Sequence, residues 1–445
     1  MSRRSIVGIF LLLAAFAPAF SGTRSLSLDE AIEIAVKQNK NLQIAKLGVQ
    51  KAEAQVREAI GNALPSLNLS AGYNYNIQLP VFFFPDPATG SVTPVRFGLT
   101  NAYTVNAQLQ QVLFNSAVFT GIGASKIYEH AAEAQLNAVV AEVVSETKRL
   151  YYQALAAKAF VEVADATMKN AEETQKSITA LFNEGLVAEF DKIRSDVAVL
   201  NLQPTVADAR SAQYNALAAL QTFLVVDLTD TLAISANGFP APSDVPSEDS
   251  VMVKALRSNY ELKSLALQVD VSKEFIDIYR SDYFPTLAAF GQWQNLGQSE
   301  SLSNWTTASS TAVGLNFSVN LFNGFRTNAK VEQAKVDWLS NKQRYDQVEN
   351  LIRLQVRTIV NQMRAAKLRI DAQKSTVGQA QRGFDIARIR YTEGTGSILE
   401  INDAETALAR ARVNEISALL DYYVTRATLD RVTGDVEERF LRLAR

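Results

Sequence analysis

The spacing of hydrophobic residues along the chain switches between two periods, and these periods predict its elements. From 67 to 79 every odd-numbered residue is apolar, and the even-numbered residues are Asn, Ser, Gly or Gln. This alternation is typical of a strand with one apolar and one polar face. It returns along three later stretches, so we predict two strand pairs, near 66–80 with 101–114 and near 286–296 with 310–322.

A long helical stretch follows each strand pair. No Gly or Pro occurs between 124 and 184, and apolar or small residues recur there at alternating steps of three and four. The same spacing returns from Ile352 to Tyr391. Such spacing is the seam of a coiled coil. We predict long helices over 116–182 and 325–391 and return helices over 188–225 and 397–433, with Pro204 marking a kink or a restart in the first return helix.

The two halves of the chain repeat each other. An offset of 209 residues places Glu184-Gly185 on Glu393-Gly394, and an offset of 208 places Leu113-Phe114-Asn115 on Leu321-Phe322-Asn323. The elements follow in the same order in both halves, which indicates a tandem structural repeat. We divide the chain into a first repeat at 22–228, a proline-containing linker at 229–246 and a second repeat at 247–445.

The N-terminus has the pattern of a secretory signal peptide. Arg3 and Arg4 precede an apolar run, and Ala17-Pro18-Ala19 follows it. A membrane anchor is the alternative, but the run is shorter than the ~20 residues that span a bilayer. We predict a signal peptide at 1–21 and a mature chain that leaves the cytoplasm.

The amino-acid composition limits the chemical functions that the chain can be expected to have. Lys and Arg number 44 and Asp and Glu 46, so net charge gives no reason to expect nucleic acid as a partner. The chain has no cysteine and one histidine, and it lacks glycine-rich phosphate loops and nucleophile motifs. We therefore expect no enzyme activity, no cofactor and no metal site.

Four strands with one apolar face leave two open sheet edges. Closing those edges into a barrel needs several copies of the chain, and three copies would supply about twelve strands. The apolar face would then meet lipid and the polar face a water-filled lumen. Helices of this length extend roughly 100 Å at 1.5 Å per residue, so they need neighbours along their whole length.

The stretch from Tyr391 to Asp403 joins a long helix to its return helix and is predicted to form a tip. Gly394 and Gly396 suit the turn. Ser397 and Glu400 have capping-box spacing. Asp403 lies three residues beyond Glu400, which puts both carboxylates on one helix face.

Taken together, these features resemble the TolC-like outer-membrane efflux and secretion channels over essentially the whole mature chain. The resemblance rests on the tandem repeat, on the strand pairs ending in Leu-Phe-Asn, and on the tips at 183–186 and 391–395. It implies a mainly α fold with a β-barrel part, in which a homotrimer builds a twelve-strand β-barrel and a twelve-helix tube. Such a channel is a passive exit duct for small-molecule efflux or type I secretion in the outer membrane of a Gram-negative bacterium, with a large periplasmic part. Its partners would be outer-membrane lipid, a periplasmic adaptor protein and an inner-membrane transporter.

The resemblance also assigns residues at the tips. It implies a closed periplasmic aperture formed by Asp191, Glu400, Asp403 and Tyr391. The residues expected to contact the adaptor are those of the two turns: Glu184, Gly185, Leu186, Glu393, Gly394 and Thr395. A basic residue that some family members carry at the position of Gly396 is absent, so the link between the closed tips must differ or be weaker.

Simpler interpretations stand beside these assignments. Glu400 could only cap its helix, and Asp403 and Asp191 could only be favourable charges near helix N-termini. For the whole chain, the alternative is a secreted or periplasmic structural coiled-coil protein without channel activity. That alternative explains the long seams but not four strands with barrel alternation.

Overall fold

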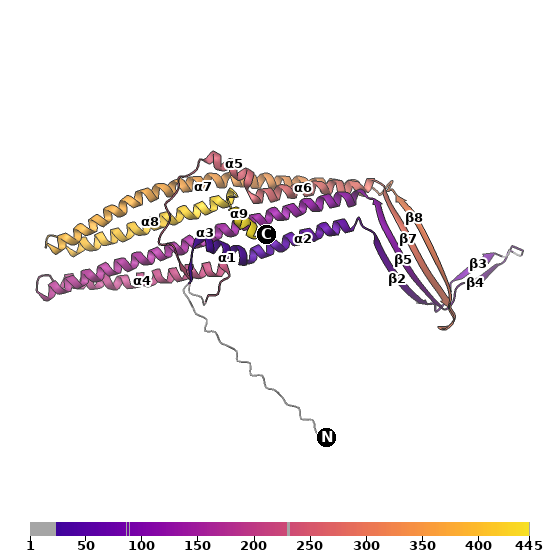
Figure 1. Cartoon of the computed structure of the whole chain (residues 1–445), viewed down its shortest axis with the longest axis horizontal. Helices are drawn as coiled ribbons and strands as arrows, with labels where there is room; N and C mark the ends of the chain where they lie inside the picture. The colour runs from indigo at the N-terminus through magenta and orange to yellow at the C-terminus, as the bar shows by residue number, and fades with distance from the viewer. Residues whose placement is uncertain (1–23, 86, 89, 229–231, 445) are drawn as a thin grey trace, which may run out of the picture.

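The computed structural model describes residues 24–85, 87–88, 90–228 and 232–444. The expected signal peptide lies outside these residues. The molecule is elongated, with long helices at one end and a sheet of strands at the other (Figure 1). Among the described residues, no helix has the length and apolar character needed to cross a membrane.

The order of elements is the same in both repeats, apart from β3 and β4 in the first and the short helices η1 and α9 in the second. The first repeat and its preceding strand comprise β1 (Arg24–Leu26), α1 (Leu28–Gln38), α2 (Lys40–Gly61), β2 (Ser66–Tyr75), β3 (Val81–Pro85), β4 (Val92–Arg96), β5 (Asn101–Phe114), α3 (Ser116–Asn183) and α4 (Glu189–Leu224). The rest comprises β6 (Leu232–Ile234), α5 (Glu248–Ser258), α6 (Tyr260–Arg280), the 3-10 turn η1 (Ser281–Tyr283), β7 (Thr286–Ser299), β8 (Thr306–Ser318), α7 (Arg326–Thr392), α8 (Ile398–Val432) and α9 (Glu438–Ala444).

Four strands form one antiparallel sheet in the order β2-β5-β7-β8. Both predicted strand pairs are therefore present, and the register gathers the odd-numbered residues of β2 on one face. Tyr73 lies opposite Tyr103, and Tyr103 lies opposite Gly297 on the next strand. The odd-numbered side chains of β2 and β8 are largely exposed within the single chain, including Leu67, Leu69, Val313, Leu315 and Phe317.

Aromatic rings cover glycines on neighbouring strands of this sheet. A Cβ atom at Gly297 would lie 2.3 Å from the ring of Tyr103, and one at Gly314 would lie 2.9 Å from the ring of Phe290. Only glycine leaves room for such contacts without displacing the ring. These pairs fix how closely β5, β7 and β8 pack.

The loop between β2 and β5 holds an antiparallel ribbon that the sequence analysis did not predict. Strands β3 and β4 pair with each other and not with the four-stranded sheet. The ring of Phe97 packs against Phe82 and Phe84 with centroids 5.6 Å apart in each case. Figure 1 shows the ribbon projecting beyond the far end of the sheet.

The long helices form two coiled-coil arms, α3 with α4 and α7 with α8, which lie side by side in Figure 1. Contact between α3 and α8 joins the arms within the chain. The main core lies where the arms meet the shorter helices. It includes Val143, Leu150, Val356, Met363 and Tyr422, all buried.

Caps repeat between the halves. Ser27 and Glu30 form the full capping box expected at the start of α1. Asn39 caps α2 by accepting hydrogen bonds from Asn41 and Leu42, and its repeat partner Asn259 caps α6 in the same way. The repeat detected in the sequence is therefore visible in the capping interactions.

Two irregular segments are more regular than the sequence alone indicates. Helix α4 continues through the exposed Pro204, so no helix restarts there. The predicted linker contains β6, which pairs in parallel with β1. It is also held by side chains, because the hydroxyl groups of Tyr422 and Tyr423 donate to the carbonyls of Ser243 and Pro240 at 2.7 and 2.8 Å.

Candidate aperture at the helix tips

Both coiled-coil arms end in the same backbone turn. Gly185 and Gly394 take left-handed φ angles of 75° and 73°. The amide of Leu186 donates to the carbonyl of Leu181 at 2.9 Å, and that of Thr395 donates to the carbonyl of Arg390 at 2.8 Å. This is the Schellman arrangement, which satisfies the last carbonyls of a helix. The turn residues expected to meet an adaptor are thus held in a defined shape and exposed.

Arg390 organises the second tip beyond its backbone. Its carbonyl also accepts from the amide of Gly396 at 3.0 Å and from the hydroxyl of Thr395 at 3.1 Å. Its guanidinium donates to the carbonyl of Thr395 at 3.2 Å, and Nη1 lies 3.4 Å from Oε2 of Glu400. The side chain therefore bridges the turn and joins α7 to α8.

The predicted capping box at Ser397 is half formed. Its hydroxyl accepts from the amide of Glu400 at 3.3 Å, which caps α8. Within the described part of the chain the Ser397 amide does not donate to the Glu400 carboxylate, because that carboxylate pairs with Arg390 instead. The carboxylate of Glu400 thus does not act as a cap.

Gly396 explains why this tip has no basic residue at that position. A Cβ atom there would lie 3.1 Å from Cβ of Arg390 and 3.1 Å from the backbone nitrogen of Tyr391. A longer side chain would have to move the turn. The cation at this tip comes from Arg390, which the sequence analysis did not single out.

Tyr391 lies at the contact between the two arms. Burial raises the pKa of its hydroxyl above the usual value, and the negative charge of Asp191 on α4 adds to the rise. The hydroxyl oxygen is buried without a hydrogen-bond partner in the described structure. Tyr391 and Asp191, both expected at the aperture, are therefore near each other but not hydrogen-bonded.

The remaining aperture candidate is less constrained. Asp403 is exposed, and the described residues offer it neither an ion pair nor a hydrogen bond. Glu400 and Asp191 are half-buried. The three carboxylates thus differ: one has a cationic partner, one faces a tyrosine and one is open to solvent.

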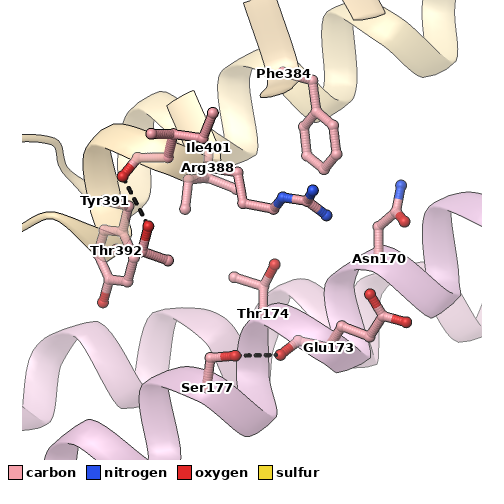
Figure 2. A pocket seen from close by; sticks show the side chains of 10 residues that line it. Asn170, Glu173, Thr174, Ser177, Phe384, Arg388, Tyr391, Thr392 and Ile401 are labelled. Carbon is pink, nitrogen blue, oxygen red and sulfur yellow. Dashed lines mark hydrogen bonds between the residues drawn. The ribbon is translucent and has the colours of Figure 1, made fainter. Parts of the chain in front are cut away.

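A cavity of about 360 Å³ lies beside the tips between α3 and α7 (Figure 2). Its wall is polar on the α3 side, with Asn170, Glu173, Thr174 and Ser177. Figure 2 shows the guanidinium of Arg388 projecting from α7 across this space toward α3. The arms are therefore less tightly packed here than along the core.

One buried carboxylate near this cavity escaped the sequence analysis. Glu405 on α8 is only 7% exposed, and its Oε1 has no hydrogen-bond partner in the described structure. Burial raises the pKa of this carboxyl to about 7, while hydrogen bonding from Asn170 opposes the rise. The signal for it was its spacing, because Glu405 is four residues from Ile401 and three from Leu408, both buried.

A sheet with one apolar face, continued by two tandem coiled-coil arms with capped tips, defines a fold that joins an amphipathic sheet to long helices. Comparison with known proteins gives the family. The model of the outer membrane efflux protein family matches residues 31–224 and 251–435, and the chain belongs to that family. Membership places the protein in the outer membrane of Gram-negative bacteria.

Individual relatives agree with this assignment. The chain is 21% identical over 440 residues to the outer membrane protein TolC of Escherichia coli (strain K12), covering 95% of this chain and 86% of TolC. It is 27% identical over 352 residues to the alkaline protease secretion protein AprF of Pseudomonas aeruginosa, covering 77% and 72% of the two chains. The crystal structure of the Campylobacter jejuni CmeC outer membrane channel has the same fold, with a TM-score of 0.75 at 19% identity over 92% of this chain and 85% of that one.

Proposed function

We propose that this chain forms a homotrimeric exit duct that is gated at its tips and works with a periplasmic adaptor and an inner-membrane pump. The observation that carries the proposal is the set of open flanks on the single chain. Strands β2 and β8 each pair on one side only, because they are the outer strands of the sheet. An open strand edge needs a partner, and β8 of one copy can pair with β2 of the next.

The helices leave corresponding flanks open. In the chain α4 packs mainly on α3, while α7 packs on α8 and α6. Large apolar side chains remain exposed on α4 and α7, including Ile193, Val197, Leu200, Leu354, Leu368 and Ile386. Different surfaces on the two flanks favour head-to-tail association, which closes into a ring.

Three copies would place about twelve strands around one axis, enough to enclose a lumen. The register supports the polarity of that lumen. Asn68, Gln108 and Gln292 are successive cross-strand partners on the even-numbered face, whereas Leu67, Leu109 and Gly291 are partners on the odd-numbered face. The odd-numbered face would meet lipid and the even-numbered face water.

The tips lie at the opposite end of the molecule from the sheet (Figure 1). With the sheet in the outer membrane, the arms extend into the periplasm and present both turns to an adaptor. The exposed turn residues support that role. AprF is an alkaline protease secretion protein, so exported proteins as well as small molecules are candidate cargo.

Two measurements test the proposal. Cell fractionation followed by electrophoresis without heating should recover a trimer from outer membranes, and the purified trimer should conduct ions in planar lipid bilayers. Addition of the cognate adaptor should raise that conductance. Recovery as a soluble rod would favour the structural coiled-coil alternative, and a wide conductance at every pH in the absence of any adaptor would reject gating.

A further inference from the structure

The two repeats treat equivalent carboxylates differently. With an offset of 209 residues, Asp196 on α4 corresponds to Glu405 on α8. Asp196 accepts a hydrogen bond from Gln175 at 2.8 Å and lies 4.0 Å from Nζ of Lys192. It is partly exposed and well partnered.

Both partners are replaced in the second repeat. Phe384 stands where the first repeat has Gln175, and Ile401 stands where it has Lys192. These two side chains are 3% and 1% exposed and belong to one apolar cluster with Ala387 and Leu408. The residues of the second arm that correspond to the two partners of Asp196 are therefore apolar, and they help to bury the Glu405 carboxylate.

Glu405 instead faces the other arm. Asn170 of α3 is close enough to lower the pKa of this carboxyl, so Glu405 lies in the contact between α3 and α8, which we call the α3–α8 seam. Asn170 also lines the cavity of Figure 2, together with Glu173 and Arg388. Neither charged group forms an ion pair with Glu405. Helix α4 approaches α8 one turn farther on, at Ala409 and Val413, through Leu202, Thr205 and Ala209, which carry no charge.

A carboxylate buried without a cation is costly, and its protonated form is favoured while the seam is packed. Separation of the arms would admit water and hydrate the ionised form. We propose that Glu405 makes the α3–α8 seam a proton-responsive lock, packed when the carboxyl is protonated and released when it ionises. This inference rests on the proposed gated duct, because release of the seam would let α7 and α8 move away from α3 and α4 at the tips.

The direction of the pH effect follows from the pKa of Glu405. It is about 7 in the packed seam, against roughly 4.3 for a solvated glutamate. The packed seam therefore binds the proton more tightly. The stability of the packed seam relative to the separated arms is highest below about pH 4, declines as the pH rises and reaches its minimum once the pH passes about 7. Alkaline pH on the periplasmic side is expected to open the channel.

The test uses the full-length trimer in planar bilayers, with the pH of the periplasmic side varied from about 5 to about 8. The open probability of the unaltered channel should rise about tenfold or more over this range, and Glu405→Gln should stay at the low-pH level throughout. Asp196→Asn, the equivalent change in the first repeat, should keep the response.

A directional variant separates a lock from a structural role. Phe384→Gln returns the donor that the first repeat uses, which should lower the pKa of Glu405 in the packed seam toward the solvated value and so reduce the rise in open probability with pH. A pH response that is the same in Glu405→Gln as in the unaltered channel would overturn the lock, as would an undiminished response in an assembled Phe384→Gln trimer. Should Glu405→Gln fail to assemble, Glu405→Leu fills the same apolar site and must also be insensitive to pH.

A second readout does not depend on conduction. The chain has no cysteine, so spin labels can be placed at Glu172→Cys on α3 and Thr406→Cys on α8, both exposed. The distance between labels should lengthen from about pH 5 to about pH 8, and Glu405→Gln should abolish the change. A fixed distance would overturn the lock. A pH-dependent distance in a protein that never conducts would reject the duct and leave the lock standing.

Discussion

Arg390 and Glu400 form an ion pair of 3.4 Å across the second tip, and the first repeat has no counterpart to it. The equivalent positions hold Leu181 and Asp191. Both members of the pair are about half exposed, so it contributes little stability, on the order of 0–1 kcal/mol. Its consequence is electrostatic, because it places a positive charge beside one of the carboxylates proposed to line the aperture.

The pair predicts that Arg390→Gln makes the channel more selective for cations. Removing the guanidinium leaves Glu400 uncompensated, so three more negative charges act on the aperture of the proposed trimer. The measurement is the reversal potential in a salt gradient at low ionic strength, where the Debye length is about 30 Å at 0.01 M. Arg382→Gln, on an exposed site of the same helix, is the control and should leave the potential unchanged. Equal shifts in both variants would contradict the prediction.

The carboxylates themselves are expected to act in the opposite direction. Glu400→Gln combined with Asp403→Asn should lower cation selectivity in planar bilayers, because both charges near the aperture are lost. Asp403→Asn alone should account for most of the change, since Glu400 is already compensated by Arg390. Unchanged selectivity in the double variant would reject an aperture role for these residues.

Period and repeat were enough to predict the sheet and the arms, because burial on one face sets the spacing of apolar residues directly. The alternation from 67 to 79 and the register of β2 with β5 agree, although β2 ends at Tyr75. The ribbon of β3 and β4 was not predicted, because Pro85 and Pro94 suggest a loop and apolar and polar residues do not alternate along the two short strands.

The tips were predictable only in part. The glycines at the two turns can be recognised in the sequence, since a left-handed residue closes each helix. Arg390 did not stand out, because one arginine in a long charged helix gives no sign of a partner ten positions away. Glu405 was a visible exception to the apolar seam, but its isolation depends on Phe384 and on α3, which only the assembled arms bring together.

The two faces of β8 are predicted to tolerate charge very differently. Val313 is 83% exposed on the face proposed to meet lipid, and its neighbour Ala312 lies on the opposite face, which is proposed to meet the lumen. Val313→Arg should destabilise the membrane-inserted trimer by about 2–4 kcal/mol, whereas Ala312→Arg should assemble normally. The yield of heat-sensitive trimer from outer membranes measures the difference. Equal yields would mean that the odd-numbered face does not contact lipid.

The contact between Gly297 and Tyr103 is predicted to limit the stability of the sheet. Gly297→Ala puts a methyl group where the ring now lies, 2.3 Å from the nearest ring atom, so the ring must move or the strands must separate. Overpacking of this kind costs about 1–3 kcal/mol, and the trimer should dissociate at a lower temperature. Gly291→Ala on the same strand is the matched control, because its Cβ would meet Val313 at an ordinary 3.7 Å. If both variants dissociated at the same temperature, the position of the Tyr103 side chain would not require glycine at 297.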